Sequence, residues 1–162
     1  MPTKIDYLST YLRDHRAGAT VGVNLARRLA EENADSPYAA FLTLLARQIE
    51  DDVATLESYM ARFDVEPSML KDAGAAIAEK LGRLKPNEHL TSYSPLSRLQ
   101  ELEMLRSGVV GKLGLWQALR EVSDTDPRLD AAELQALIEK AEAQVAGLTE
   151  HQAMASRDAF AD

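Results

Sequence analysis

The sequence contains no cysteine, which excludes disulfide bonds, thiolate metal sites and a thiol nucleophile. Aromatic residues make up only 6% of the 162 residues, and no basic cluster is interleaved with them. The 18 Lys and Arg against 26 Asp and Glu give a net charge of −8, which would repel a phosphate backbone, so we expect no nucleic acid partner. No apolar run approaches the roughly 18 residues that a membrane span needs, so we expect no membrane partner and a cytoplasmic location.

Catalytic and cofactor fingerprints are also missing. The chain has no Gly-x-Ser-x-Gly, no Walker loop and no dinucleotide-binding pattern, and none of its three histidines has a second His at i+3 or i+4. His15 lies beside Asp14 on the apolar stripe of a predicted helix, where a core imidazole is favoured over a catalytic base. We expect no cofactor, and we leave open whether the protein is an enzyme while favouring that it is not.

What the sequence does have is a helical pattern. With 46% apolar residues the chain is large enough to bury one core, so we expect a single domain over residues 1–162. Apolar residues recur at spacings of three and four, which is typical of amphipathic helices, and prolines mark several helix starts. Thr3 with Asp6, and Asp130 with Glu133, match the capping-box pattern. The predicted helices cover residues 4–33, 37–63, 67–84, 95–122 and 130–156, with a loop at 85–93 and a frayed C-terminus.

The lengths of the connections predict how these helices pack. Short turns near Asp35 and Thr125 require the first two long helices, and the last two, to fold back as antiparallel hairpins. About thirty residues, including the short helix, separate the hairpins, which is enough to cross the length of a bundle. The predicted fold is all-α: an up-down four-helix bundle with a long crossover that contains an extra short helix.

This order of elements resembles the ferritin-like superfamily of bacterioferritins and rubrerythrins. Its members with a dinuclear metal centre place a Glu on each of two helices and a Glu-x-x-His on each of the other two. Glu50 and Glu142 match the Glu of that motif at mid-height, but Val53 and Val145 stand at the His positions. Because no Glu occurs at the same height on the other two helices, the ligand set is degenerate, and we expect an apolar, metal-free interior there. An atypical site, if one exists, would use Glu50, Asp52, Glu139 and Glu142; the alternative is that these are solvated side chains and salt-bridge partners.

Five glycines in helix interiors form a second unusual feature. Each costs about 1 kcal/mol relative to alanine, which implies a reason for its presence. The glycines are Gly18, Gly22, Gly108, Gly111 and Gly114. They favour close packing inside the monomer or a homodimer interface, and a ligand pocket opened by the missing side chains is the third and least favoured alternative.

Three functions follow as hypotheses. The favoured one is a noncatalytic ferritin-like bundle of unknown role that acts through protein-protein contacts, as a homodimer or with an unknown partner. The alternative is a dinuclear carboxylate oxidoreductase with atypical ligands around Glu50 and Glu142. The third is a bundle that holds a small apolar ligand between its helices.

Overall fold

The computed structural model describes residues 1, 3–67 and 92–161, and within them the chain is all-helical, with no strand. Four long helices are present, and a short 3-10 helix, η1 (Ser123–Thr125), joins the last two. The long helices are α1 (Lys4–Glu32), α2 (Ala39–Arg62), α4 (Pro95–Val122) and α5 (Ala131–Phe160). The predicted helix over 67–84 and most of the predicted loop at 85–93 lie outside the described residues. None of the described helices is long and apolar enough to cross a membrane.

The helix starts follow from local capping. The Thr3 side chain accepts a hydrogen bond from the Asp6 amide, and the Asp6 carboxylate accepts one from the Thr3 amide, so the predicted capping box is present. Ser94 caps α4 and is followed by Pro95 in the first turn. The Asp130 carboxylate caps α5 by accepting hydrogen bonds from the backbone amides of Ala132 and Glu133.

Two boundaries differ from the sequence-based prediction. α2 begins at Ala39 rather than Pro37, because Ser36 and Pro37 are part of the turn that follows α1. α5 continues to Phe160 instead of ending near Ser156. Its last turns are held in place because Ala155 is fully buried and the Asp158 carboxylate accepts a hydrogen bond of 2.6 Å from the Tyr38 hydroxyl.

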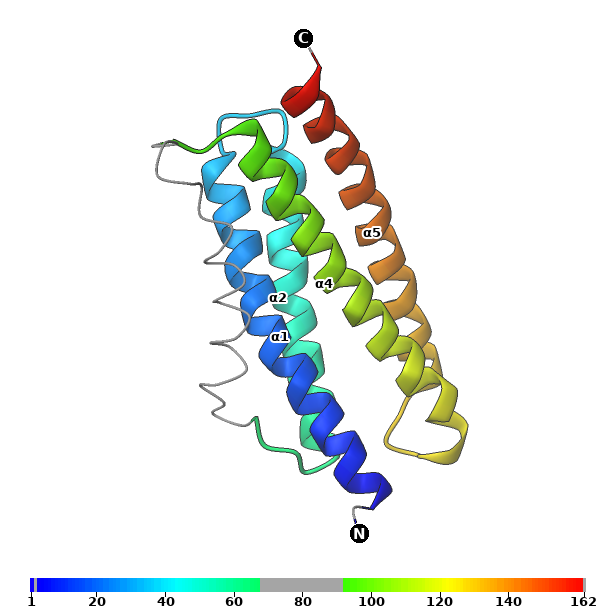
Figure 1. Ribbon diagram of the computed structural model, residues 1–162. Helices are drawn as coiled ribbons and strands as arrows, with labels where there is room; N and C mark the ends of the chain where they lie inside the picture. The colour runs from blue at the N-terminus through cyan, green and yellow to red at the C-terminus, as the bar shows by residue number, and fades with distance from the viewer. Residues whose placement is uncertain (2, 68–91, 162) are drawn as a thin grey trace.

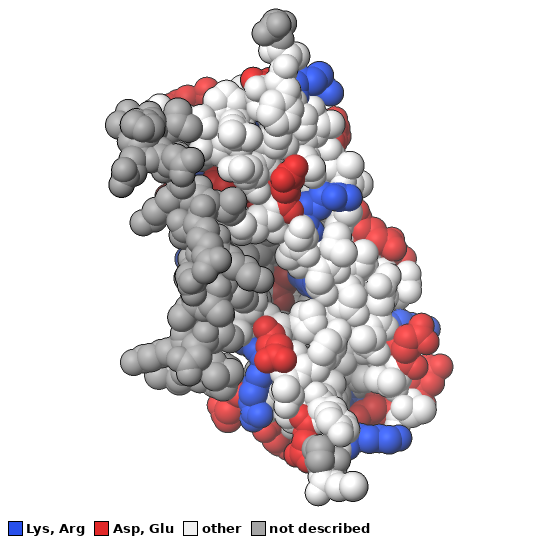
Figure 2. Space-filling model, in the orientation of Figure 1, with Lys and Arg blue, Asp and Glu red and all other residues white. Residues whose placement is uncertain are grey.

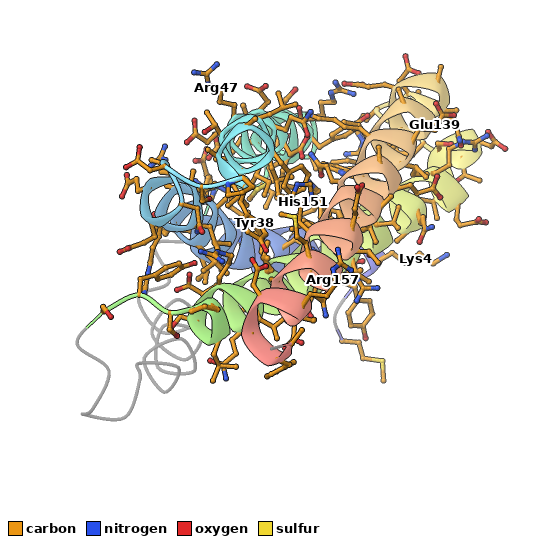
Figure 3. All side chains as sticks on the ribbon, turned by 90° about the horizontal axis from the view of Figure 1, so that it is seen from above. Lys4, Tyr38, Arg47, Glu139, His151 and Arg157 are labelled. Carbon is orange, nitrogen blue, oxygen red and sulfur yellow. The ribbon has the colours of Figure 1, made fainter. Side chains whose placement is uncertain are left out.

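The helices form two hairpins that lie side by side (Figure 1). α1 packs against α2 and α4 packs most closely against α5, and the two helices of each hairpin run in opposite directions. α1 and α4 face each other across the front of the molecule in Figure 1, and the chain termini lie at opposite ends. Side chains such as Tyr38 and His151 lie between the helices when the bundle is seen from its end, whereas Arg47 and Glu139 point outward (Figure 3).

The core consists of two clusters rather than one continuous seam. The upper cluster, toward the C-terminal end in Figure 1, comprises Leu25, Ala26, Leu29, Tyr38, Leu42, Leu45, Ala46, Ile49, Leu99, Leu102, Leu105, Val109, Leu148 and Ala155. The lower cluster comprises Leu12, Leu56, Tyr59, Met60, Phe63, Val65, Leu115, Trp116, Leu119, Leu129, Leu134, Ile138 and Ala141. The middle of the bundle, between the two clusters, holds the candidate site.

Polar contacts close both ends. At the upper end the buried Asn33 accepts a hydrogen bond of 2.5 Å from Arg98 Nε and donates one of 3.0 Å to the Tyr93 hydroxyl. At the lower end Glu133 accepts hydrogen bonds from the Tyr59 hydroxyl (2.9 Å) and from Arg62 (3.0 Å). These contacts join the two hairpins at both ends of the bundle. The geometry of the middle depends on the residues on the facing sides of the helices.

Candidate functional site: a cavity and a buried ion-pair cluster at mid-height

A cavity of about 420 Å³ lies at mid-height between α1, α2 and α4. Its walls are mainly apolar. They are formed by Gly18, Ala19 and Gly22 of α1, Ile49, Val53 and Leu56 of α2, and Leu105, Gly108, Val109, Gly111, Leu115 and Trp116 of α4. The polar residues that line it are Tyr11, Asp14, His15, Asp52 and Lys112. The face that α1 and α4 share is visibly hollowed near its middle (Figure 2).

Four of the five glycines line this cavity from opposite sides. Gly18 and Gly22 belong to α1, and Gly108 and Gly111 belong to α4. A Cβ atom added at any of these positions, or at Gly114, would meet no heavy atom of another element within 4 Å among the described residues. Among the described residues the glycines therefore line open space between two helices, while the homodimer interface that their spacing also favours stays a prediction.

Alanine at these positions is expected to stabilise the protein. Gly18→Ala and Gly111→Ala should each raise the free energy of unfolding by up to about 1 kcal/mol, because alanine is the better helix former and its methyl group meets none of the described residues. Thermal or urea unfolding measures this directly. Gly147→Ala on α5 is the matched control: its Cβ would lie 2.6 Å from Phe41 Cε2, so the gain should disappear there. Equal gains at all three positions would contradict the open geometry.

A buried ion-pair cluster forms part of the cavity wall. Asp52 of α2 is only 3% exposed, and its carboxylate accepts hydrogen bonds from Lys112 of α4 and from Lys140 of α5, the latter at 2.6 Å. Gln144 of α5 donates to Asp52 Oδ2 at 3.1 Å and accepts from the Lys112 ammonium. Gln144 also donates to the side-chain oxygen of Gln48 at 3.3 Å. One carboxylate therefore links three helices at the waist of the bundle.

The surroundings shift the pKa values of this cluster. Burial by itself would raise the pKa of Asp52, but the charge of Lys112 and the hydrogen bonds from Lys112, Lys140 and Gln144 outweigh it and lower that pKa. Burial lowers the pKa of Lys112, and the neighbouring charge of Asp52 opposes this change. The cluster places a carboxylate and an ammonium group at the wall of an otherwise apolar cavity.

The remaining polar residues lie on the α1 side. The His15 ring is half-buried and packs edge-on against Tyr11, with 4.6 Å between the ring centroids. Burial lowers the pKa of His15, and the nearby Asp14 raises it by less, so the imidazole favours its neutral form. Asp14 itself is exposed. His15 therefore lines the cavity. The position of His15 on the apolar stripe predicted a core imidazole instead, and the ring is only half-buried.

The four carboxylates proposed from the sequence do not meet. Glu50 points away from Asp52 and forms an ion pair with Arg27 of α1, with 2.5 Å between Oε1 and Nε. Glu142 is exposed, and Glu139 is exposed and accepts a hydrogen bond from Gln135 one turn earlier. Glu50, Glu139 and Glu142 are thus surface groups. Asp52 is buried and not solvated, and it is a salt-bridge partner of Lys112 and Lys140, which the alternative in the sequence analysis included.

No group of three or more His, Asp or Glu side chains within the described ranges is arranged to hold a metal ion. The expectation of a wholly apolar waist also needs correction. Val53 does line the cavity and Val145 packs against the upper cluster, but Asp52 and Lys112 lie at the same level. The middle of the bundle is therefore part cavity and part ion pair.

Sequence patterns contained a signal for this cluster. Asp52 follows Ile49 by three residues and precedes Leu56 by four, so it falls on the buried stripe of α2. Lys112 occupies the corresponding place between Val109 and Trp116 on α4. Opposite charges on the apolar stripes of two helices predict a buried pair, because neither charge is stable alone in a core.

No protein-family model, curated protein or solved structure matches this chain at a significant level.

Proposed function

We propose that this protein binds a small, mainly apolar molecule in the cavity between α1, α2 and α4. The observation that carries the proposal is the cavity itself: about 420 Å³ of space bounded by glycines on two facing helices. This volume lies in the range of ligand sites in proteins, which are typically apolar with a few convergent polar groups. The function that we propose is binding of this molecule.

The energetics support a ligand. An interior glycine costs about 1 kcal/mol relative to alanine, and the apolar side chains that line the open cavity forgo burial energy while they stay accessible to solvent. Alanine at the four cavity glycines would remove the first of these costs, and its Cβ atom would meet no heavy atom of the described residues within 4 Å. A ligand that fills the cavity would recover this burial energy, so ligand binding accounts for helix-interior glycines that line open space.

The sole tryptophan of the chain, Trp116, lines the cavity, so its fluorescence is a built-in reporter of occupancy. We expect octanol, decanol and dodecanol to change its emission in a saturable way. Affinity should rise about fourfold for each added methylene until the cavity is full, because burying one methylene contributes about 0.8 kcal/mol. Mass spectrometry of an organic extract of the purified protein would identify any ligand that is carried along from the cell.

Matched variants make the test specific. Gly111→Leu places a side chain in the cavity and should abolish the response, whereas Gly114→Leu, on the same helix but outside the cavity lining, should retain it. Melting temperatures establish that both variants are folded. The proposal fails if the alcohols do not bind the wild type, or if both variants respond alike.

A protein-contact role is the second candidate, and exposed apolar side chains favour it. Ile5 and Tyr7 in the first turns of α1 are 62% and 63% exposed, and Val110 on α4 is 46% exposed. Surface apolar groups of this kind are enriched where proteins meet. A homodimer would show twice the chain mass by light scattering, and charged residues at Ile5 and Tyr7 would dissociate it if its interface includes the first turns of α1.

We also propose that the fold is ferritin-like. The support is the order of its elements: two hairpins with short connections, α1 with α2 and α4 with α5, separated by a long intervening segment. In this proposal the buried Asp52 cluster stands at the level where metal-binding members carry their ligands.

A further inference from the structure

We infer that the cavity selects an apolar molecule with a carboxylate group, and that the ammonium group of Lys112 binds this carboxylate. The inference rests on the proposed function, because it assigns the polar end of a ligand whose apolar part fills the cavity. It is drawn from the charges and the unused hydrogen-bonding capacity of the groups at the cavity wall.

The charge count of the buried cluster is not balanced. Asp52 contributes one negative charge, while Lys112 and Lys140 each contribute a positive one, so the cluster carries a net positive charge. Lys140 is one-third exposed and does not line the cavity, so solvent screens its charge. Lys112 is 16% exposed and lines the cavity directly. An anion in the cavity would neutralise the excess charge, and a cation would add to it.

Hydrogen-bonding capacity points the same way. The Asp52 carboxylate already accepts from three donors, on Lys112, Lys140 and Gln144. An ammonium group has three N–H donors, and the described residues use two on Lys112, toward Asp52 and Gln144. One N–H donor of the charged Lys112 ammonium group therefore remains at the cavity wall, and it matches an acceptor such as a carboxylate oxygen.

The other polar groups that line the cavity do not reverse this preference. Asp14 is exposed, so solvent screens its negative charge, and the lowered pKa of His15 favours a neutral imidazole. Tyr11 contributes a hydroxyl group without charge. Lys112 is consequently the one charged side chain on the described wall of the cavity that has a donor available.

Three probes of equal chain length test the inference on the wild type alone. Decanoate, decanol and decylamine each have ten carbons and differ in their polar end; because the alkyl tail of decanoate is one carbon shorter, Trp116 fluorescence titrations compare the head groups with a small bias against the carboxylate. We expect decanoate to bind at least as tightly as decanol despite the cost of desolvating its charge, and decylamine to bind most weakly. A stronger affinity for decylamine than for decanoate would overturn the inference.

Variants then assign the preference to one side chain. Lys112→Met should weaken decanoate binding by about tenfold or more and leave decanol within about threefold, because a hydrogen bond to a charged group is lost. Lys112→Arg should retain the preference for decanoate. Lys140→Met is the comparison variant: it removes the excess positive charge from outside the cavity, so it should weaken decanoate binding by less than Lys112→Met does and leave decanol unchanged.

The outcomes separate the two proposals. If no probe binds the wild type, the proposed ligand-binding function fails and this inference fails with it. If decanol binds with the expected chain-length dependence but decanoate affinity is unchanged in Lys112→Met, only the role of Lys112 is overturned. An equal loss of both probes in Lys112→Met also overturns it, because the lysine would then shape the cavity without reading the head group.

Discussion

Replacing Asp52 with leucine is expected to lower the free energy of unfolding by about 3 kcal/mol. Asp52 is 3% exposed and is the shared partner of Lys112 and Lys140. Its removal leaves Lys112 largely buried and without a counterion, since the remaining described partner, the amide oxygen of Gln144, is neutral. Urea denaturation of the wild type and the variant, with the slope of the transition compared, measures the loss.

Two further variants control this experiment. Asp51→Leu changes the neighbouring carboxylate, which is exposed, and should alter stability by no more than about 0.5 kcal/mol. The double variant Asp52→Leu with Lys112→Met should recover much of the loss, because removing both partners of a buried pair is often close to neutral. A loss below about 1 kcal/mol in Asp52→Leu would mean that the cluster is hydrated and not buried.

The same cluster should make the free energy of unfolding depend on pH in the acid range. The pKa of folded Asp52 is lowered, so its stabilising contribution is complete above the unfolded value of about 3.9 and is lost as the pH falls through the folded pKa. Asp52→Asn should therefore flatten the loss of stability below about pH 4. If the variant shows the wild-type acid dependence, other carboxylates account for it.

Replacing Trp116 with alanine is expected to destabilise the protein by about 3–5 kcal/mol. The Trp116 side chain is 1% exposed, lies 5.9 Å from the Tyr59 ring between centroids, and belongs to the lower cluster while also lining the cavity. Truncation to alanine joins the volume of the indole ring to the existing cavity. The surrounding helices cannot close so large a space, so most of the packing energy is lost. Calorimetry or urea unfolding measures the effect.

Ligand binding provides the second readout for this variant. A larger cavity should shift the chain-length optimum toward longer alcohols, which titration calorimetry detects without the lost tryptophan signal. Trp116→Phe retains an aromatic ring and should show a smaller loss of stability and a smaller shift. Full stability in Trp116→Ala, or an unchanged optimum, would show that the indole does not separate the cavity from the lower cluster.

The carboxylate that the metal-binding motif indicated and the carboxylate that the structure places in the interior lie on different faces of α2. Glu50 and Asp52 are two residues apart, which corresponds to about 200° around a helix axis. Glu50 was singled out by its resemblance to a metal-binding motif, yet it faces Arg27 on α1, and Asp52 faces the interior. The periodicity of Ile49 and Leu56 indicated the correct face of α2, so the stripe was the more reliable guide.

The sequence by itself determined the four long helices of the described residues, several of their ends and the pairing of neighbours. Capping by Thr3, Ser94 and Asp130 depends on atoms within a few residues, and short turns force adjacent helices together, so this information is local. Only the tertiary structure decided that four glycines line one open cavity and that Asp52 pairs with lysines from two other helices. Those outcomes depend on the separation and rotation of α1, α2, α4 and α5, which many distant contacts set together and no single stretch of sequence encodes.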